Sequence, residues 1–183
     1  MKSLIQIFLI MFSLANYAQE TNSNSNTRKF IDNAEFIQVN RDWSVKAQLT
    51  SGIGEVVSFF PIEATNLKSN LKIKALQMDM TVNEGNKPYF KSSWIDLNEI
   101  DEFITFLDSY VVPNLNDKTE KKQSTTYIFN TKEIRFSFHI GQNSKRISIF
   151  LKDNGSIDNS HYFWTESQNN KIPDLLTILK QIR

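Results

Sequence analysis

The dominant pattern along this chain is an alternation of apolar and polar residues with a period of two. Apolar side chains occupy every second position in the segments 45–49, 134–140 and 147–151, and mainly polar side chains lie between them. Such alternation is typical of an antiparallel strand with one buried face. We therefore expect three such strands, and we expect Phe136 and Phe138 on the buried face of theirs.

Two further strands are expected between residues 56 and 80. The segment 56–60 is largely apolar, and we expect its strand to end near Pro61, since proline has no N–H to donate to a neighbouring strand. Within 71–80 the apolar phase shifts at Ala75 and Leu76. A shift of one position in a strand predicts a β-bulge at these two residues.

Two segments change to helical spacing. After Asp96, apolar residues recur three and four positions apart until Pro113, and Asp96 followed by Glu99 is typical of a capping box. The segment 172–182 carries a second apolar stripe, with Pro173 suited to a first helical turn. The sequence thus predicts an α+β fold, predominantly antiparallel β with two helices.

The order of these elements repeats along the chain. Several strands, an aromatic strand and one helix are expected in residues 30–113 and again in 124–183. The segment 74–80 aligns with 146–152 at an offset of 72 residues. We therefore expect two tandem units of about four strands followed by one helix, joined by the charged loop 114–123.

This tandem arrangement resembles in topology the PUR-type nucleic-acid-binding repeats and, less closely, the tandem-repeat secreted inhibitors of β-lactamase. The resemblance is one of architecture and carries over no residues. For function, it implies a nucleic-acid binder as one alternative.

Residues 1–18 are typical of an export signal. Lys2 precedes a short apolar run, and small residues end at Ala18, which is the pattern a signal peptidase recognises. The run is shorter than the roughly 20 apolar residues of a membrane span. We expect cleavage near Ala18, then a disordered tether over 19–29, which has no apolar residue, and a single globular domain over 30–183.

Composition limits both the cellular location that we expect for the protein and the chemistry that it can perform. The chain has no cysteine, which excludes disulfides, thiol catalysis, cysteine-ligated zinc and a lipid-bearing cysteine after the leader. No later segment is apolar for long enough to span a membrane. We therefore expect a bacterial periplasmic or secreted protein without a membrane span or lipid anchor in its mature form.

Charge argues against nucleic acid. Of 21 basic and 20 acidic residues, removal of Lys2 with the leader leaves 20 of each, a formal net charge of zero. Proteins that bind nucleic acid typically carry a positive excess. The charge balance thus disfavours the nucleic-acid alternative.

Few residues offer catalytic or metal-binding chemistry. His139 and His161 are the two histidines of the chain, and neither stands in a metal-binding spacing. No nucleophile elbow, phosphate-binding loop or dinucleotide fingerprint is present. We expect no catalytic residue, metal or cofactor; the enzyme alternative would need a histidine and a carboxylate, such as His161 and Glu166, brought together by the fold.

Aromatic residues gather in the strand expected before each helix. Because successive strand residues point to opposite faces, Tyr162 and Trp164 share one face. If these rings lie on a sheet face that the helices do not cover, they are exposed beside arginines and would suit a binding surface. The alternative interpretation is that they belong to the ordinary core between sheet and helix. The candidate ligand-binding residues are Tyr162, Trp164, Tyr89, Arg135, Arg146 and His161.

The sequence alone therefore predicts an exported, non-catalytic binding or protein-interaction module, with a protein or a glycan bound at an exposed sheet face. A secreted or periplasmic enzyme with a His/carboxylate site is the first alternative. A nucleic-acid binder of PUR-like topology is the second.

Overall fold

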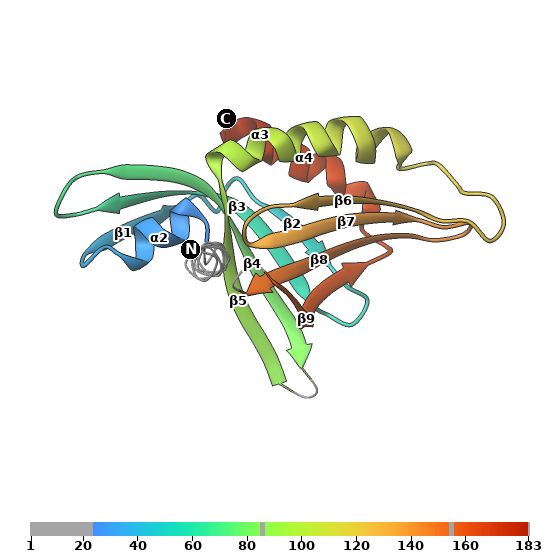
Figure 1. The fold of residues 1–183 in the computed structure, drawn as a ribbon, viewed down its shortest axis with the longest axis horizontal. Helices are drawn as coiled ribbons and strands as arrows, with labels where there is room; N and C mark the ends of the chain where they lie inside the picture. Colours follow the sequence, from blue (N-terminus) through green and yellow to red (C-terminus); the bar gives the residue numbers. More distant parts are fainter. Residues whose placement is uncertain (1–23, 85–86, 154–155, 183) are drawn as a thin grey trace, which may run out of the picture.

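The computed structural model describes residues 24–84, 87–153 and 156–182. The predicted export signal and the first part of the predicted tether, up to residue 23, lie outside the described residues. Figure 1 shows an α+β fold in which two antiparallel sheets lie beneath a pair of helices. The predicted fold class is confirmed.

The first sheet, sheet A, has five strands in the order β1-β3-β4-β5, with β2 also paired to β3. β1 and β2 pair with different halves of β3 and so share one edge of the sheet. The strands are β1 Ile37–Arg41, β2 Ala47–Thr50, β3 Val56–Asn66, β4 Lys72–Glu84 and β5 Lys87–Asp96.

The second sheet, sheet B, has four strands in the order β6-β7-β8-β9. They are β6 Thr125–Asn130, β7 Ile134–Ile140, β8 Lys145–Asp153 and β9 Ser156–Thr165. Helix α3, Leu97–Phe106, follows sheet A, and helix α4, Ile172–Ile182, follows sheet B. The predicted order of strands and one helix therefore occurs twice.

Each of these helices is extended by a tighter or wider turn. A π-helical turn η1, Leu107–Val111, and a 3-10 turn η2, Val112–Asn114, continue α3, and a 3-10 turn η3, Asn169–Lys171, precedes α4. The predicted capping box forms at the start of α3, where the Asp96 N–H donates to Glu99 Oε2 at 3.1 Å. Helical spacing therefore placed both helices correctly.

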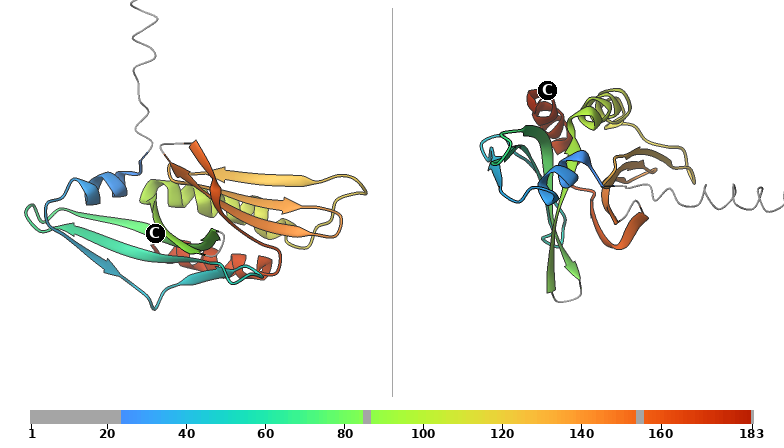
Figure 2. Two further views of the ribbon diagram at one scale, coloured as in Figure 1. Left: turned by 90° about the horizontal axis from the view of Figure 1, so that it is seen from below. Right: turned by 60° about the vertical axis from the view of Figure 1, so that its left-hand side comes forward.

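The two helices lie next to each other over both sheets (Figures 1 and 2). Helix α4 contacts β2, β3 and β4 of sheet A. Aromatic side chains of α3 instead pack on sheet B: Phe103 stacks on Phe129 of β6, with ring centroids 4.9 Å apart. Buried residues of both sheets and both helices form one continuous hydrophobic cluster, which includes Phe136 and Phe138 as predicted.

Two predictions for sheet A are wrong. β3 does not end near Pro61 but continues to Asn66. Pro61 lies between the residues that pair with β2 and those that pair with β1, so its missing N–H falls at the break in that edge. In β4 no bulge interrupts Ala75 and Leu76, because pairing with β3 and β5 is continuous there.

The phase shift in β4 has another cause, which is burial on both faces. Leu76 belongs to the main core, whereas Ala75 lies on the outer face of sheet A in a second cluster with Phe60 and Ile62. Ile31 of a further helix packs on this second cluster. A strand covered on both sides shows an apolar run that mimics a bulge.

That further helix, α2 Asn26–Asp32, was not predicted. The sequence indicated a disordered tether over residues 19–29, yet Ser25 and Thr27 are fully buried. Their side chains hydrogen-bond to Glu133 and Asp96, respectively. Buried hydrogen bonds hold this segment in place. A prediction of disorder based on the absence of apolar residues cannot detect such bonds.

Candidate functional site

The outer face of sheet B is the face turned away from α3 and α4, and it carries most of the predicted site residues. Cross-strand pairing places His139 beside Arg146, Arg135 beside Phe150, and Phe150 beside Tyr162. Alternate residues of the same strands, such as Phe138, are buried on the inner face. Sheet pairing therefore brings aromatic and basic side chains together on the outer face.

Two ring contacts organise this face. The rings of Phe150 and Tyr162 stack with centroids 5.2 Å apart. The guanidinium of Arg146 lies over the Trp164 ring, 4.7 Å from its centroid, an arrangement typical of a cation–π contact. Tyr162 is 40% exposed and Trp164 37%, so both rings keep a surface that a partner can reach.

The cations on this face are held by polar neighbours. Arg146 donates to Glu166 Oε1 through Nη2 at 2.8 Å and through Nε at 3.1 Å. Arg135 Nε donates to Asn130 Oδ1 at 2.9 Å. These bonds hold the two guanidinium groups in place, and Glu166 gives Arg146 an anionic partner.

Of the other two predicted residues, Tyr89 does not join this group. Tyr89 lies on sheet A, half-buried, and packs against the main core. The backbone of His161 belongs to β9, but its side chain lies outside the described part of the structure. The structure thus groups Tyr162, Trp164, Arg135 and Arg146 and leaves Tyr89 apart.

Among the residues that the structure describes, His139 has a hydroxyl neighbour and no carboxylate partner. His139 Nδ1 lies 2.9 Å from Thr126 Oγ1, in contact with a hydroxyl. Among the described residues, no group of three or more His, Cys, Asp or Glu is placed to hold a metal ion.

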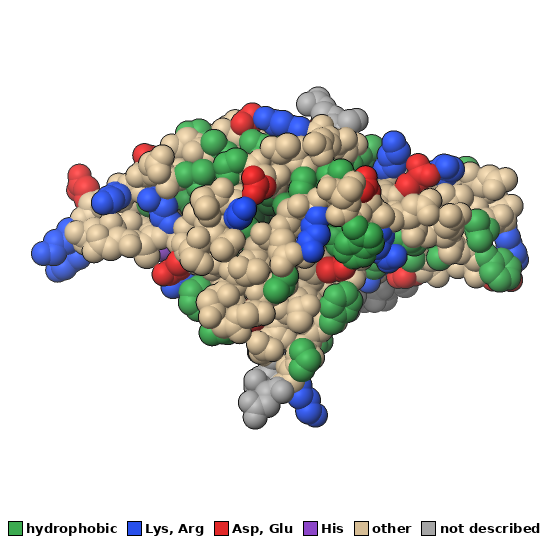
Figure 3. All heavy atoms as spheres, turned by 180° about the vertical axis from the view of Figure 1, so that it is seen from behind, with side chains coloured by type: hydrophobic (Ala, Val, Ile, Leu, Met, Phe, Trp, Pro, Cys, Tyr) green, Lys and Arg blue, Asp and Glu red, His purple; other side chains and the backbone are tan. Residues whose placement is uncertain are grey.

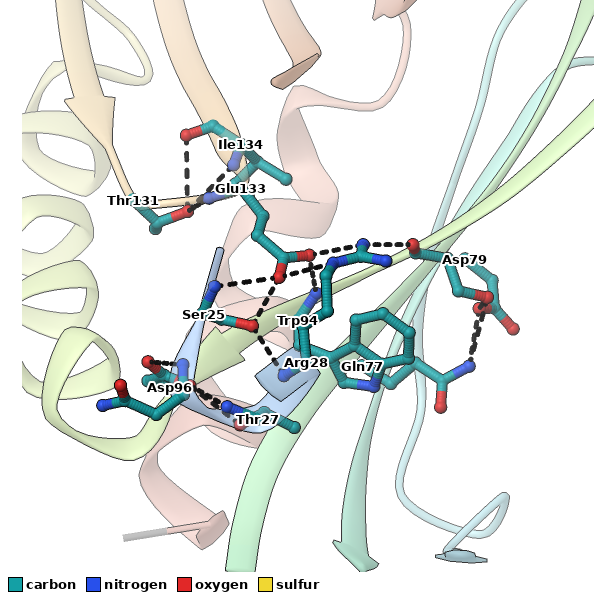
Figure 4. A network of polar contacts seen from close by, with 12 residues as sticks. Ser25, Thr27, Arg28, Gln77, Asp79, Trp94, Asp96, Thr131, Glu133 and Ile134 are labelled. Carbon is teal, nitrogen blue, oxygen red and sulfur yellow. Dashed lines mark hydrogen bonds and ion pairs between the residues drawn. The ribbon is translucent and has the colours of Figure 1, made fainter. Parts of the chain in front are cut away.

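Glu133 lies in the turn between β6 and β7 and is 3% exposed. It was not identified as a candidate from the sequence. Figure 4 shows it at the centre of a polar network. Its carboxylate accepts from Arg28 Nη2 at 2.8 Å, from the Trp94 N–H at 3.0 Å and from the Ser25 N–H at 3.2 Å. Glu133 thereby joins α2, β5 and sheet B.

Asp96 is the second buried anchor of α2. Its carboxylate accepts the N–H groups of Asn26 and Thr27 at 2.8 and 2.9 Å and the ammonium of Lys132 at 2.8 Å. Burial alone would raise the pKa of Asp96, but these bonds outweigh it and hold the pKa below its usual value. At Glu99, in contrast, burial is the larger effect and raises the pKa of the carboxyl.

Because donors satisfy both anchors, we interpret this network as a structural junction.

A pocket of about 520 Å³ on the outer face of sheet A was also missed. We name it the sheet A cleft, and its principal residues are Arg41, Trp43, Gln77, Asp79, Phe90 and Ser92. The available sequence signal was an isolated Trp43 in the otherwise polar segment 40–44.

No protein-family model matches this chain, and no curated protein sequence matches it. In the part of the chain that the structure describes, no helix has the length and apolar character needed to cross a membrane. The function is therefore inferred from the chemistry of the surfaces.

Proposed function

We propose that this protein is an exported, non-catalytic binding module whose outer face of sheet B binds a partner protein. The observation that supports this proposal is the exposed pairing of Trp164 with Arg146 beside the Tyr162 stack. Trp, Tyr and Arg are the residues most enriched among those that dominate protein-interface energetics.

The fixed geometry of this face favours binding. Arg146 is held by Glu166 and by the Trp164 ring, and Tyr162 is held by Phe150. Side chains that are already ordered lose little conformational entropy when a partner covers them. A preorganised group of aromatic and arginine side chains is therefore suited to a stable contact.

Protein is favoured over nucleic acid because of charge. Glu166 already pairs with Arg146, so a phosphate would have to displace a carboxylate. On the face of the molecule that Figure 3 shows, acidic and basic side chains are interspersed. Stacked aromatics do suit single strands, so a fluorescent oligothymidine is the comparison probe.

The test compares the mature protein with Trp164→Ala and Phe36→Ala as immobilised baits in extracellular and periplasmic extracts of the source cells. Phe36 is a matched control, since it is an aromatic residue that is 54% exposed elsewhere. We expect a protein retained by the parent and by Phe36→Ala but lost with Trp164→Ala. Equal retention by all three baits, or Trp164-dependent binding of oligothymidine instead, would contradict a protein partner.

Export is tested separately. Because small residues end at Ala18, we expect the exported species to begin at or near Gln19. N-terminal sequencing of protein recovered outside the cytoplasm measures this directly. Retention of Met1 in that protein would refute cleavage near Ala18, and absence of the protein from every fraction outside the cytoplasm would refute the proposed export.

A further inference from the structure

The sheet A cleft carries chemistry that the proposed function does not use. It lies on the outer face of sheet A, and its volume of about 520 Å³ falls within the range of small-molecule sites. It is lined from β1, β4, β5 and the loop after β1. Since it belongs to the other sheet, it is independent of the proposed protein interface.

Two exposed aromatic rings line this cleft. Trp43, in the loop between β1 and β2, is 58% exposed, and Phe90 of β5 is 62% exposed. Trp43 is nevertheless held in place, because its ring packs on the buried Phe60 with centroids 4.4 Å apart. Packing on Phe60 fixes the indole while more than half of it stays accessible, so together with Phe90 it presents an ordered aromatic surface that a ligand can cover.

A row of hydrogen-bonding groups forms the floor of the cleft. Gln77 is 3% exposed; its Nε2 donates to Asp79 Oδ1 at 2.7 Å, an interaction visible in Figure 4. Arg41 Nε donates to Gln77 Oε1 at 3.1 Å, and Ser92 Oγ donates to Asp79 Oδ1 at 2.6 Å. These bonds fix the row before any ligand arrives.

Some donor and acceptor atoms in this row are free to bind a ligand. Within the described residues, the terminal nitrogens of Arg41 and Oδ2 of Asp79 have no hydrogen-bond partner. Arg41 therefore offers donors, and Asp79 offers an acceptor, on the same floor. Adjacent hydroxyl groups, each both donor and acceptor, match such a pair.

We propose that the sheet A cleft binds a neutral saccharide. A pyranose ring has an apolar C–H face that an aromatic ring can cover, and hydroxyl groups around its rim that need donors and acceptors. Trp43 and Phe90 supply the aromatic surfaces, and Arg41 and Asp79 supply the polar groups.

The charged residues that line the cleft favour neutral saccharides over anionic ones. Of the described residues that line the cleft, Arg41 is the cation and Asp79 the anion, so their formal charges balance. A phosphate or uronate would meet the Asp79 carboxylate as well as the Arg41 guanidinium and would gain little from the pair. A neutral sugar has no such penalty.

Isothermal titration calorimetry of the mature protein with cellohexaose, maltohexaose, mannohexaose, xylohexaose and chitohexaose tests this proposal. We expect at least one of these probes to bind with a dissociation constant below about 1 mM. Trp43→Ala and Phe90→Ala should each weaken that binding by about 10-fold or more.

Matched controls separate this site from the other face and from misfolding. Phe36→Ala and Trp164→Ala, also exposed aromatics, should leave the affinity within about twofold of the parent, since surface changes outside a site have small effects. Far-ultraviolet circular dichroism and thermal melting confirm that each variant is folded.

Three results would overturn the saccharide site. They are no binding of any of these oligosaccharides at about 5 mM, binding that Trp43→Ala and Phe90→Ala leave unchanged, and tighter binding of oligogalacturonate than of the neutral probes. Partner capture that depends on Trp164 would be unaffected by any of them, so the two proposals fail separately.

Discussion

The outer faces of the two sheets differ although their strands follow one another in the same order. On sheet A, Phe60, Ile62 and Ala75 are buried, with Ile31 of α2 packed on them. On sheet B, the outer face instead has two small polar residues, Ser137 and Ser148, at its centre; they are buried, but the rings of Tyr162 and Trp164 beside them are partly exposed. The comparison teaches that strand order alone does not decide whether a sheet face is core or surface.

Part of the difference originates in α2, which packs on this face together with Val39 and Trp94. Its first turn is held by Glu133 and Asp96, two carboxylates contributed by the turn between β6 and β7 and by the end of β5. Once anchored there, the short helix α2 covers one part of the outer face of sheet A and leaves the other part as a pocket, the sheet A cleft.

The largest effect should come from removing a buried ring from the outer face of sheet A, and a much smaller one from removing a partly exposed ring from the outer face of sheet B. Phe60→Ala removes a fully buried ring and should lower the free energy of unfolding by about 3 to 5 kcal/mol. Phe150→Ala, which removes a half-buried ring stacked on Tyr162, should cost about 1 kcal/mol. Urea denaturation measures both, and equal losses would mean that the two outer faces do not differ in burial.

An intermediate effect is expected at the anchor of α2. Asp96→Asn should lower the free energy of unfolding by roughly 2 to 3 kcal/mol near neutral pH, because charged hydrogen bonds are replaced by neutral ones. Since the pKa of Asp96 is lowered in the folded protein, its stabilisation is present above the ordinary value of 3.8 and is lost as the pH falls through the folded value. Denaturation across pH should therefore show the parent and the variant converging in acid.

Glu99→Gln is the control for this pH dependence, with the opposite sign. Burial raises the pKa of Glu99, so the native state holds that proton more tightly than the unfolded chain. The stability of the parent relative to Glu99→Gln should fall as the pH rises above the ordinary value of 4.5. A parallel response of the two variants to pH would refute the assignment of opposite roles to these neighbouring carboxyls.

The smallest effect is expected at the proposed protein interface. Trp164→Ala should change the free energy of unfolding by no more than about 1 kcal/mol, because the ring is partly exposed. Phe138→Ala on the inner face of the same sheet should cost about 3 to 5 kcal/mol. A loss of several kcal/mol for Trp164→Ala would place its ring in the core and remove the support for the interface.

The sequence by itself determined the elements whose spacing repeats locally. A period of two identified strands β7 and β8 of sheet B and the inner position of Phe138, and the pair Asp96 and Glu99 marked the start of α3. These features follow from backbone geometry within a few residues, so neighbouring positions suffice to reveal them. The same alternation also placed Tyr162 and Trp164 on a shared face.

Only the tertiary structure decided what depends on distant residues. Ser25 is buried because Glu133, 108 positions away, accepts its bonds, and β3 passes Pro61 because β1 and β2 divide the edge of the sheet there. Tyr89 faces the core although sequence placed it with Tyr162. The sheet A cleft exists because strand pairing brings the loop that carries Trp43 close to Phe90, 47 positions along the chain, on either side of one polar row. Long-range pairing leaves no local period in the sequence, so these contacts required the folded chain.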